Sequence, residues 1–132
     1  MKLADFIPKL ERLASGSAIA EVRRQVAYDG LRLINAGYRD SVDPYGSRWE
    51  PLKQRQGKPL VLTGAFRDTW TSYPTPNGVR FLSAVDYGAY HQYGTRTIPF
   101  RRVIPMQRYG LPKAWTDIIN AAYSKNVRKA LA

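Results

Sequence analysis

Residues 18–39, AIAEVRRQVAYDGLRLINAGYR, have the clearest helical pattern in the chain. Apolar residues recur in it at spacings of four, three and four, which places them on one face of a helix: Ala27, Leu31, Ile34 and Tyr38. Four more widen this face into a broad stripe: Ile19, Val22, Val26 and Leu33. Gly30 weakens the helix interior by roughly 1 kcal/mol, a small loss in so long an element. The pattern predicts a long helix whose apolar face needs a partner.

Two further helices are predicted, one on each side of this stretch in the sequence. Residues 3–13 form the first, because Phe6, Leu10 and Leu13 share a face, and the glycine of the SGS run at 15–17 ends it. Ser17 is then expected to cap the long helix. Residues 111–131 form the closing helix, with Pro112 in its first turn. Its apolar face consists of Trp115, Ile118, Ile119, Ala122 and Tyr123.

The region between the helices loses helical periodicity and gains turn and strand signals. Residues 43–67 read as a long loop that opens with the turn signal Asp-Pro-Tyr-Gly at 43–46. Residues 68–108 read as β-rich, with a hairpin at the PNG of 76–78 and a further short strand between Pro99 and Pro105. We therefore predict an α+β fold in a single domain of residues 1–132. A small antiparallel β-sheet packs against a long N-terminal helix, within residues 1–42, and a C-terminal helix.

Composition excludes several classes of protein and of site. The chain has no cysteine and one histidine, so disulfides, thiol nucleophiles and the usual zinc ligand sets cannot form within one chain. Its ten acids are scattered, which disfavours calcium or magnesium sites, and no phosphate-binding glycine motif occurs. We expect no cofactor. No apolar run of about 18 residues encodes a membrane span, and the N-terminus lacks a signal-peptide pattern, which predicts a mature cytosolic protein.

A formal net charge of +11 sets the electrostatic expectation. Such an imbalance in 132 residues is typical of a chain that meets a polyanion or an acidic protein face, although a merely soluble basic surface has the same composition. Basic residues interleaved with aromatic ones at 87–108 can neutralise phosphates and stack on bases. No helix-turn-helix, zinc finger or RNP-like signature accompanies them, so we expect only non-specific contact with DNA.

The stretch DYGAYHQYGTRTIPFRRVIP, residues 86–105, holds the single histidine and is the candidate site. A catalytic His91 needs an orienting carboxylate, for which Asp86 is the nearest acid, and a nucleophile, for which no serine stands out. A structural His91 in a turn between tyrosines is the favoured interpretation. The enzymatic alternative is a small, metal-independent, toxin-like ribonuclease that stabilises phosphoryl charge with Tyr90, His91, Arg101 and Arg102.

Four pieces in order resemble the phage virion morphogenesis family, the tail-completion or head–tail joining proteins of tailed bacteriophages. They are DPYGSRWEPL (43–52), KPLVLTGAFRDTW (58–70), YGAYHQYGT (87–95) and IPFRRVIP (98–105), the last followed by a C-terminal helix. The family pattern reads D-P-x-G-x-x-W-x-P-L, K-x-L-x-x-T-G, Y-A-x-x-H-Q-F-G-T and I-P-x-R. This chain departs from it with an inserted Gly88 before the alanine and with Tyr93 in place of phenylalanine.

The resemblance implies a structural protein and not an enzyme. It implies that the H-Q-Y-G-T run is a structural signature, that Trp49 holds the 43–49 turn against the fold, and that exposed aromatic and basic residues serve interfaces. The residues so marked are Trp49, Tyr87, Tyr90, His91, Gln92, Tyr93, Gly94, Arg96, Arg101 and Arg102. The loop 51–59 and the stretch 96–108 are the expected contacts with neighbours.

The implied place is the virion neck, with assembly in the cytoplasm of the bacterial host. The implied partners are further copies of the chain in a hexameric ring, the neck or connector proteins, and the tail tube or terminator proteins. A basic nucleic-acid-binding protein, or the ribonuclease, is the alternative that the residues leave open.

Overall fold

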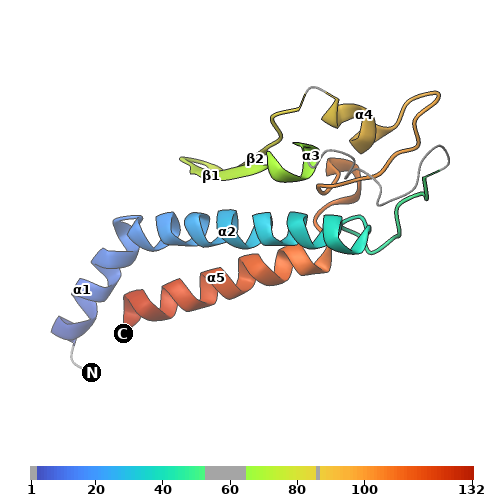
Figure 1. Ribbon diagram of the computed structural model, residues 1–132. Helices are drawn as coiled ribbons and strands as arrows, with labels where there is room; N and C mark the ends of the chain where they lie inside the picture. The colour runs from blue at the N-terminus through green and yellow to red at the C-terminus, as the bar shows by residue number, and fades with distance from the viewer. Residues whose placement is uncertain (1–2, 53–64, 86) are drawn as a thin grey trace.

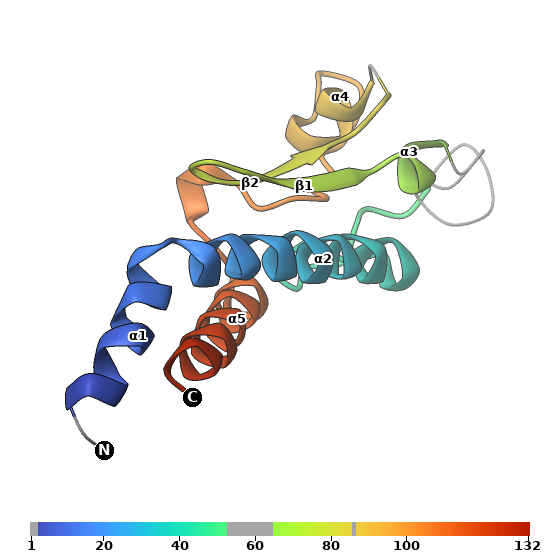
Figure 2. The ribbon, with the colours of Figure 1, turned by 90° about the vertical axis from the view of Figure 1, so that its left-hand side faces the viewer.

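The computed structural model describes residues 3–52, 65–85 and 87–132. The predicted α+β class is confirmed: helices pack with one two-stranded antiparallel sheet in these residues. The long helix α2 (Ser17–Asp40) lies between the closing helix α5 (Lys113–Leu131) on one side and the hairpin on the other (Figures 1 and 2). None of the helices described combines the length and the hydropathy that crossing a lipid bilayer requires.

The main core forms where the C-terminal half of α2 meets α5 and the loops above it. Ile34 and Tyr38 are almost wholly enclosed, and both had been placed on the apolar face by their spacing. Their buried neighbours come from distant parts of the chain, namely Trp49, Phe66, Val103 and Trp115. A second, smaller cluster lies nearer the N-terminal end of α2 and contains Val22, Val26 and Ala122. The helical periodicity thus identified the α2 half of both clusters.

The predicted hairpin is present as β1 (Thr71–Thr75) and β2 (Gly78–Leu82). Thr75 pairs with Gly78, so Pro76 and Asn77 form a two-residue loop. The Ser72 hydroxyl donates to the carbonyl of Ala27 at 2.6 Å and thereby fastens the sheet to α2. Because the sheet has only two strands, it depends on such contacts with the helix for its stability.

Gly30 marks the point where the sheet and α5 both approach α2. The Phe81 and Trp115 rings meet there edge to face, with centroids 5.2 Å apart. A Cβ atom on Gly30 would lie 2.7 Å from Phe81 Cε1, closer than side chains pack, and 3.0 Å from Trp115 Cζ3, a tight contact. The glycine that weakens the helix by its propensity is therefore required by the packing.

The helices at the two ends depart from expectation only in detail. α1 (Leu3–Ala14) ends one residue later than predicted, and Gly16 with φ 81° turns the chain into α2. The expected Ser17 cap is wrong, because Ser17 is already helical and its hydroxyl donates back to the carbonyl of Arg12 at 3.3 Å. Pro112 is the N-cap of α5, one position before its first turn.

The predicted β-rich part needs correction. No strand forms between Pro99 and Pro105, and the expected turn around His91 is instead the short helix α4 (Gly88–Tyr93). A single helical turn, α3 (Ala65–Asp68), begins inside the predicted loop and ends at the first residue of the predicted β-rich part, and a 3-10 turn, η1 (Gln107–Tyr109), precedes α5. Residues 53–59 of the loop expected to contact neighbours lie outside the described residues.

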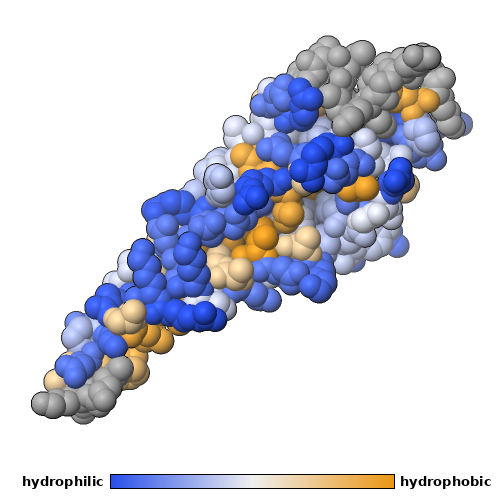
Figure 3. Space-filling model, turned by 60° about the horizontal axis from the view of Figure 1, so that its bottom comes forward, coloured by the Kyte–Doolittle hydropathy of each residue, from blue (hydrophilic) through white to orange (hydrophobic). Residues whose placement is uncertain are grey.

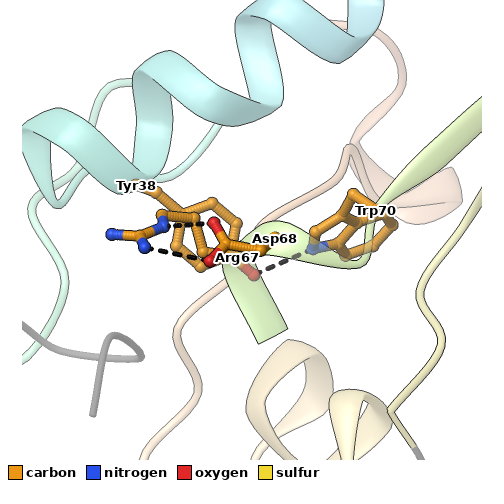
Figure 4. Close-up of polar contacts among 4 residues, drawn as sticks. All are labelled: Tyr38, Arg67, Asp68 and Trp70. Atoms are coloured by element: carbon orange, nitrogen blue, oxygen red, sulfur yellow. Dashed lines mark hydrogen bonds and ion pairs between the residues drawn. The ribbon is translucent and has the colours of Figure 1, made fainter. Parts of the chain in front are cut away.

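Figure 4 shows how the end of α2 meets the segment that leads into the sheet. The Trp70 indole nitrogen donates to the Tyr38 hydroxyl at 2.9 Å, beside the adjacent pair Arg67 and Asp68, whose Nε and Oδ1 lie 2.7 Å apart. Burial raises the pKa of Tyr38 well above its usual range, although the bond from Trp70 opposes this shift. Tyr38 therefore stays neutral and anchors Trp70 over the core.

Candidate functional site

The candidate site consists of α4 and the extended segment 95–106, called the strap below. Gly94 ends the helix with φ 76° and ψ 164°, a conformation that side chains rarely adopt. Thr95 then closes a tight turn, because its hydroxyl accepts the N–H groups of Thr97 and Ile98 at 3.3 and 3.0 Å. This turn sends the strap back across α4 toward residues 43–52, as Figure 1 shows in gold and orange.

Gln92 holds the strap to α4 through several side-chain hydrogen bonds. It is 6% exposed. Its oxygen accepts the N–H groups of Val103 and Ile104 at 2.8 and 3.2 Å, and its nitrogen donates to the Ile104 carbonyl at 2.7 Å. These bonds replace the ladder that a neighbouring strand would have offered, since buried backbone polar groups must find partners.

Arg101 is also a structural residue in this arrangement. Its side chain is 7% exposed, and its guanidinium donates to the carbonyls of Glu50 and Pro51 at 2.8 and 3.2 Å. Its backbone N–H donates to the carbonyl of His91 at 2.6 Å. A charged group of this kind is stable in an enclosed place only when its donors are matched. Arg101 therefore joins α4, the strap and the segment 50–51.

The predicted Asp-Pro-Tyr-Gly turn is confirmed, and it reaches the strap. The Asp43 carboxylate accepts the N–H groups of Tyr45 and Ser47, both at 2.9 Å. The Tyr45 hydroxyl accepts the N–H of Met106 at 2.9 Å. Trp49 is buried, and its indole donates to the Arg102 carbonyl at 2.8 Å. Two aromatic residues thus fix the far half of the strap.

His91 lies among aromatic rings, with centroids 5.6 Å from Phe66 and 5.8 Å from Tyr87. Its Nδ1 is buried and has no hydrogen-bond partner in the part of the chain that the structure describes. Burial lowers the pKa of His91 below its ordinary value of 6.5, and the positive charge of Arg101 lowers it further. A neutral imidazole packed in this way acts as a flat apolar filler. Asp86, its expected carboxylate partner, lies outside the described residues.

The three tyrosines of the site lie on its outer surface. Their exposed fractions are 42% for Tyr87, 55% for Tyr90 and 67% for Tyr93. Arg96 is exposed as well. Half-exposed aromatic rings with polar tips are typical of protein interfaces, because they lose little conformational freedom when a partner covers them.

A second aromatic group lies around Arg102 and was not predicted from the sequence. Its guanidinium carbon lies 4.2 Å from the centroid of Phe100 and 5.2 Å from that of Tyr109. Its Nε is buried and has no acceptor among the described residues. Phe100 precedes Arg102 by two residues, a spacing that puts both side chains on one side of an extended chain. This spacing could have predicted the contact between Phe100 and Arg102. Nothing in the sequence predicts that Tyr109 approaches Arg102.

The sequence-marked residues therefore divide into two groups. Trp49, His91, Gln92, Gly94 and Arg101 come together inside the unit of α4 and the strap. Tyr87, Tyr90, Tyr93 and Arg96 lie on its surface, and Arg102 lies between two rings at its edge. Tyr45 holds the strap and was missed as a site residue.

Searches of protein-family models, of curated proteins and of solved structures each found no match.

Proposed function

We propose that this chain is a structural assembly protein of a tailed bacteriophage. It completes the tail and joins it to the neck or connector of the head, as a ring of six copies in the virion. The observation that carries the proposal is the role of the residues that match the phage pattern. Gln92, Gly94 and Arg101 bind or shape backbone, and Trp49 closes the same unit.

The arrangement suits a protein that must present a rigid surface. The enclosed signature residues fix the strap to α4, and the same unit carries Tyr90, Tyr93 and Arg96 on its outside. A rigid surface with aromatic and basic residues can bind a neighbouring subunit without the entropy loss of ordering a loop. A ring closes through heterologous contacts, so any surface that joins two copies meets a different surface of the next copy.

The test is electron microscopy of lysates from a phage or prophage that lacks the gene. The proposal expects filled heads beside unattached tails, and expects normal particles when the gene is supplied in trans. Supplying Tyr93→Ala should leave heads and tails separate, whereas Tyr28→Ala should restore particles, because Tyr28 is 64% exposed on α2, outside this unit. Normal infectious particles without the gene would contradict the proposal.

The second candidate function is that of a basic nucleic-acid-binding protein or toxin-like ribonuclease. The net charge of +11 favours it, as do the rings of Phe100 and Tyr109 beside Arg102. His91, Arg96 and Arg101 also line one hollow of about 680 Å³. Against the ribonuclease stands the guanidinium of Arg101, which is bound to the carbonyls of Glu50 and Pro51. Metal-independent cleavage of RNA that His91→Ala abolishes would establish the ribonuclease.

A further inference from the structure

Helix α1 turns its apolar face away from the rest of the molecule. Phe6, Ile7 and Leu10 share one face, and they are 38%, 47% and 46% exposed. The opposite face carries Arg12, whose guanidinium donates to the carbonyls of Ala130 and Ala132 at the end of α5, at 2.9 and 3.1 Å. The polar face therefore holds α1 in place. Figure 3 shows the resulting apolar surface beside the grey N-terminal residues.

The same chain has an apolar groove that its own α1 does not fill. It encloses about 1030 Å³ between the first half of α2, the hairpin and α5. Leu111 and Tyr123 line it while 52% and 46% exposed. Its remaining apolar lining includes Ile19, Val22, Val26, Val79 and Ile119. The groove thus offers an amphipathic helix the kind of surface that such helices bind.

One edge of the apolar face of α1 and the edge of the groove carry complementary charges. Arg23 and Arg80 line the groove, and neither forms an ion pair within the described residues. Glu11 follows Ile7 by one helical turn, so it lies at the edge of the apolar face of α1. It forms no ion pair with another residue that the structure describes. Two copies with a net charge of +11 repel each other in general. A contact that brings an acid to arginines lowers this repulsion locally.

We propose that α1 of one copy binds in the groove of the next copy. Phe6, Ile7 and Leu10 would enter the apolar groove, and Glu11 would face Arg23 and Arg80. Helix and groove are different surfaces of one chain, so the contact is heterologous and repeats from copy to copy until a ring closes or a filament grows. The inference rests on the proposed ring and names the surfaces that build it.

The test uses three variants of the full chain, each with one added lysine: Leu10→Lys on α1, Tyr123→Lys in the groove, and the control Tyr28→Lys. Tyr28 is 64% exposed and lines neither surface, so it matches Tyr123 in residue type and in charge change. Circular dichroism should show all three folded, because each replaced side chain is exposed. Sedimentation velocity should show oligomers for the wild type and the control, and monomers for the other two variants.

Mixing the two monomeric variants gives the decisive result. The Tyr123→Lys chain keeps an intact α1 and the Leu10→Lys chain keeps an intact groove, so the mixture should form a one-to-one dimer with a single working contact. Four results would overturn the inference: a monomeric wild type up to hundreds of micromolar, oligomers that persist in either variant, monomers from the Tyr28→Lys control, or a mixture that stays monomeric. None of these decides tail completion, which the particle assay tests separately, because a ring could form through the tyrosines of α4.

Discussion

The side chain of Gln92 pairs with the backbone of Ile104 in both directions. Its nitrogen donates to the Ile104 carbonyl at 2.7 Å, and its oxygen accepts the Ile104 N–H at 3.2 Å. A primary amide has the same donor and acceptor groups as a peptide unit, so the glutamine stands in for a strand beside the strap. The helical turn that carries Gln92 and the strap thereby behave as one unit, although no sheet joins them.

Replacing this amide should destabilise the protein strongly. Gln92→Leu leaves the N–H groups of Val103 and Ile104 without an acceptor in an enclosed place, which should lower the free energy of unfolding by about 3 kcal/mol. The exposed Gln107 is the control, and Gln107→Leu should change it by less than about 0.5 kcal/mol. Urea unfolding measures both. Equal midpoints for the two variants would show that the Gln92 bonds are not needed.

Two glycines with similar backbone angles separate conformational strain from steric contact. Gly94 and Gly110 have φ of 76° and 72°. A Cβ on Gly94 would lie 3.1 Å from Phe100 N, whereas one on Gly110 meets nothing within 4 Å. Gly110→Ala should cost about 1 kcal/mol from strain alone, and Gly94→Ala about 2–3 kcal/mol. Thermal unfolding compares them, and a larger loss for Gly110→Ala would refute the role of the strap turn.

Gly30→Ala tests propensity against packing. Helix propensity predicts a gain of about 1 kcal/mol, whereas the contact with Phe81 and Trp115 predicts a net loss of about 2 kcal/mol. Adding Phe81→Leu should recover part of that loss by removing ring atoms at the contact. The four chains of this double-mutant cycle can be compared by urea unfolding. A stabilised Gly30→Ala would mean that the sheet does not approach α2 as closely as the structure has it.

The sole histidine should make stability depend on pH in a known direction. Because burial holds the folded pKa of His91 below 6.5, the unfolded state binds the proton more readily. The stabilisation is complete above the unfolded pKa and is lost as pH falls through it toward the folded pKa. His91→Phe keeps the ring packing and removes this titration. The free energy of unfolding of the wild type minus that of His91→Phe should fall as the pH is lowered from about 7.5 through 6.5, and a flat difference would contradict the shift.

The stability of the protein should depend on the geometry of the Arg101 side chain and not only on its charge. Arg101→Lys keeps the charge but cannot span the carbonyls of Glu50 and Pro51, which should lower the free energy of unfolding by about 2 kcal/mol. Arg96→Lys, at an exposed position, should leave stability unchanged. If both variants are as stable as the wild type, Arg101 is free for another task, which would strengthen the ribonuclease hypothesis.

The positions of the local elements could be predicted because their causes are local. The apolar spacing of α2 and α5, the Pro-Asn-Gly hairpin and the Asp43 turn depend on neighbours within a few residues. The strand expected between Pro99 and Pro105 does not form, because a strand also depends on a partner that can be distant in the sequence. A strand needs a partner strand, and here a glutamine side chain binds the backbone in its place.

The sequence was sufficient to predict helices α1, α2 and α5, the hairpin, the basic charge and the residues that mark the site. What those residues do follows from the tertiary structure, because their partners are distant in the chain. Trp49 bonds to the carbonyl of a residue 53 positions away, and Arg101 to that of one 51 positions away. Whether a glutamine, an arginine or a glycine binds a ligand, a neighbour or its own backbone depends on such contacts, and periodicity carries no information about them.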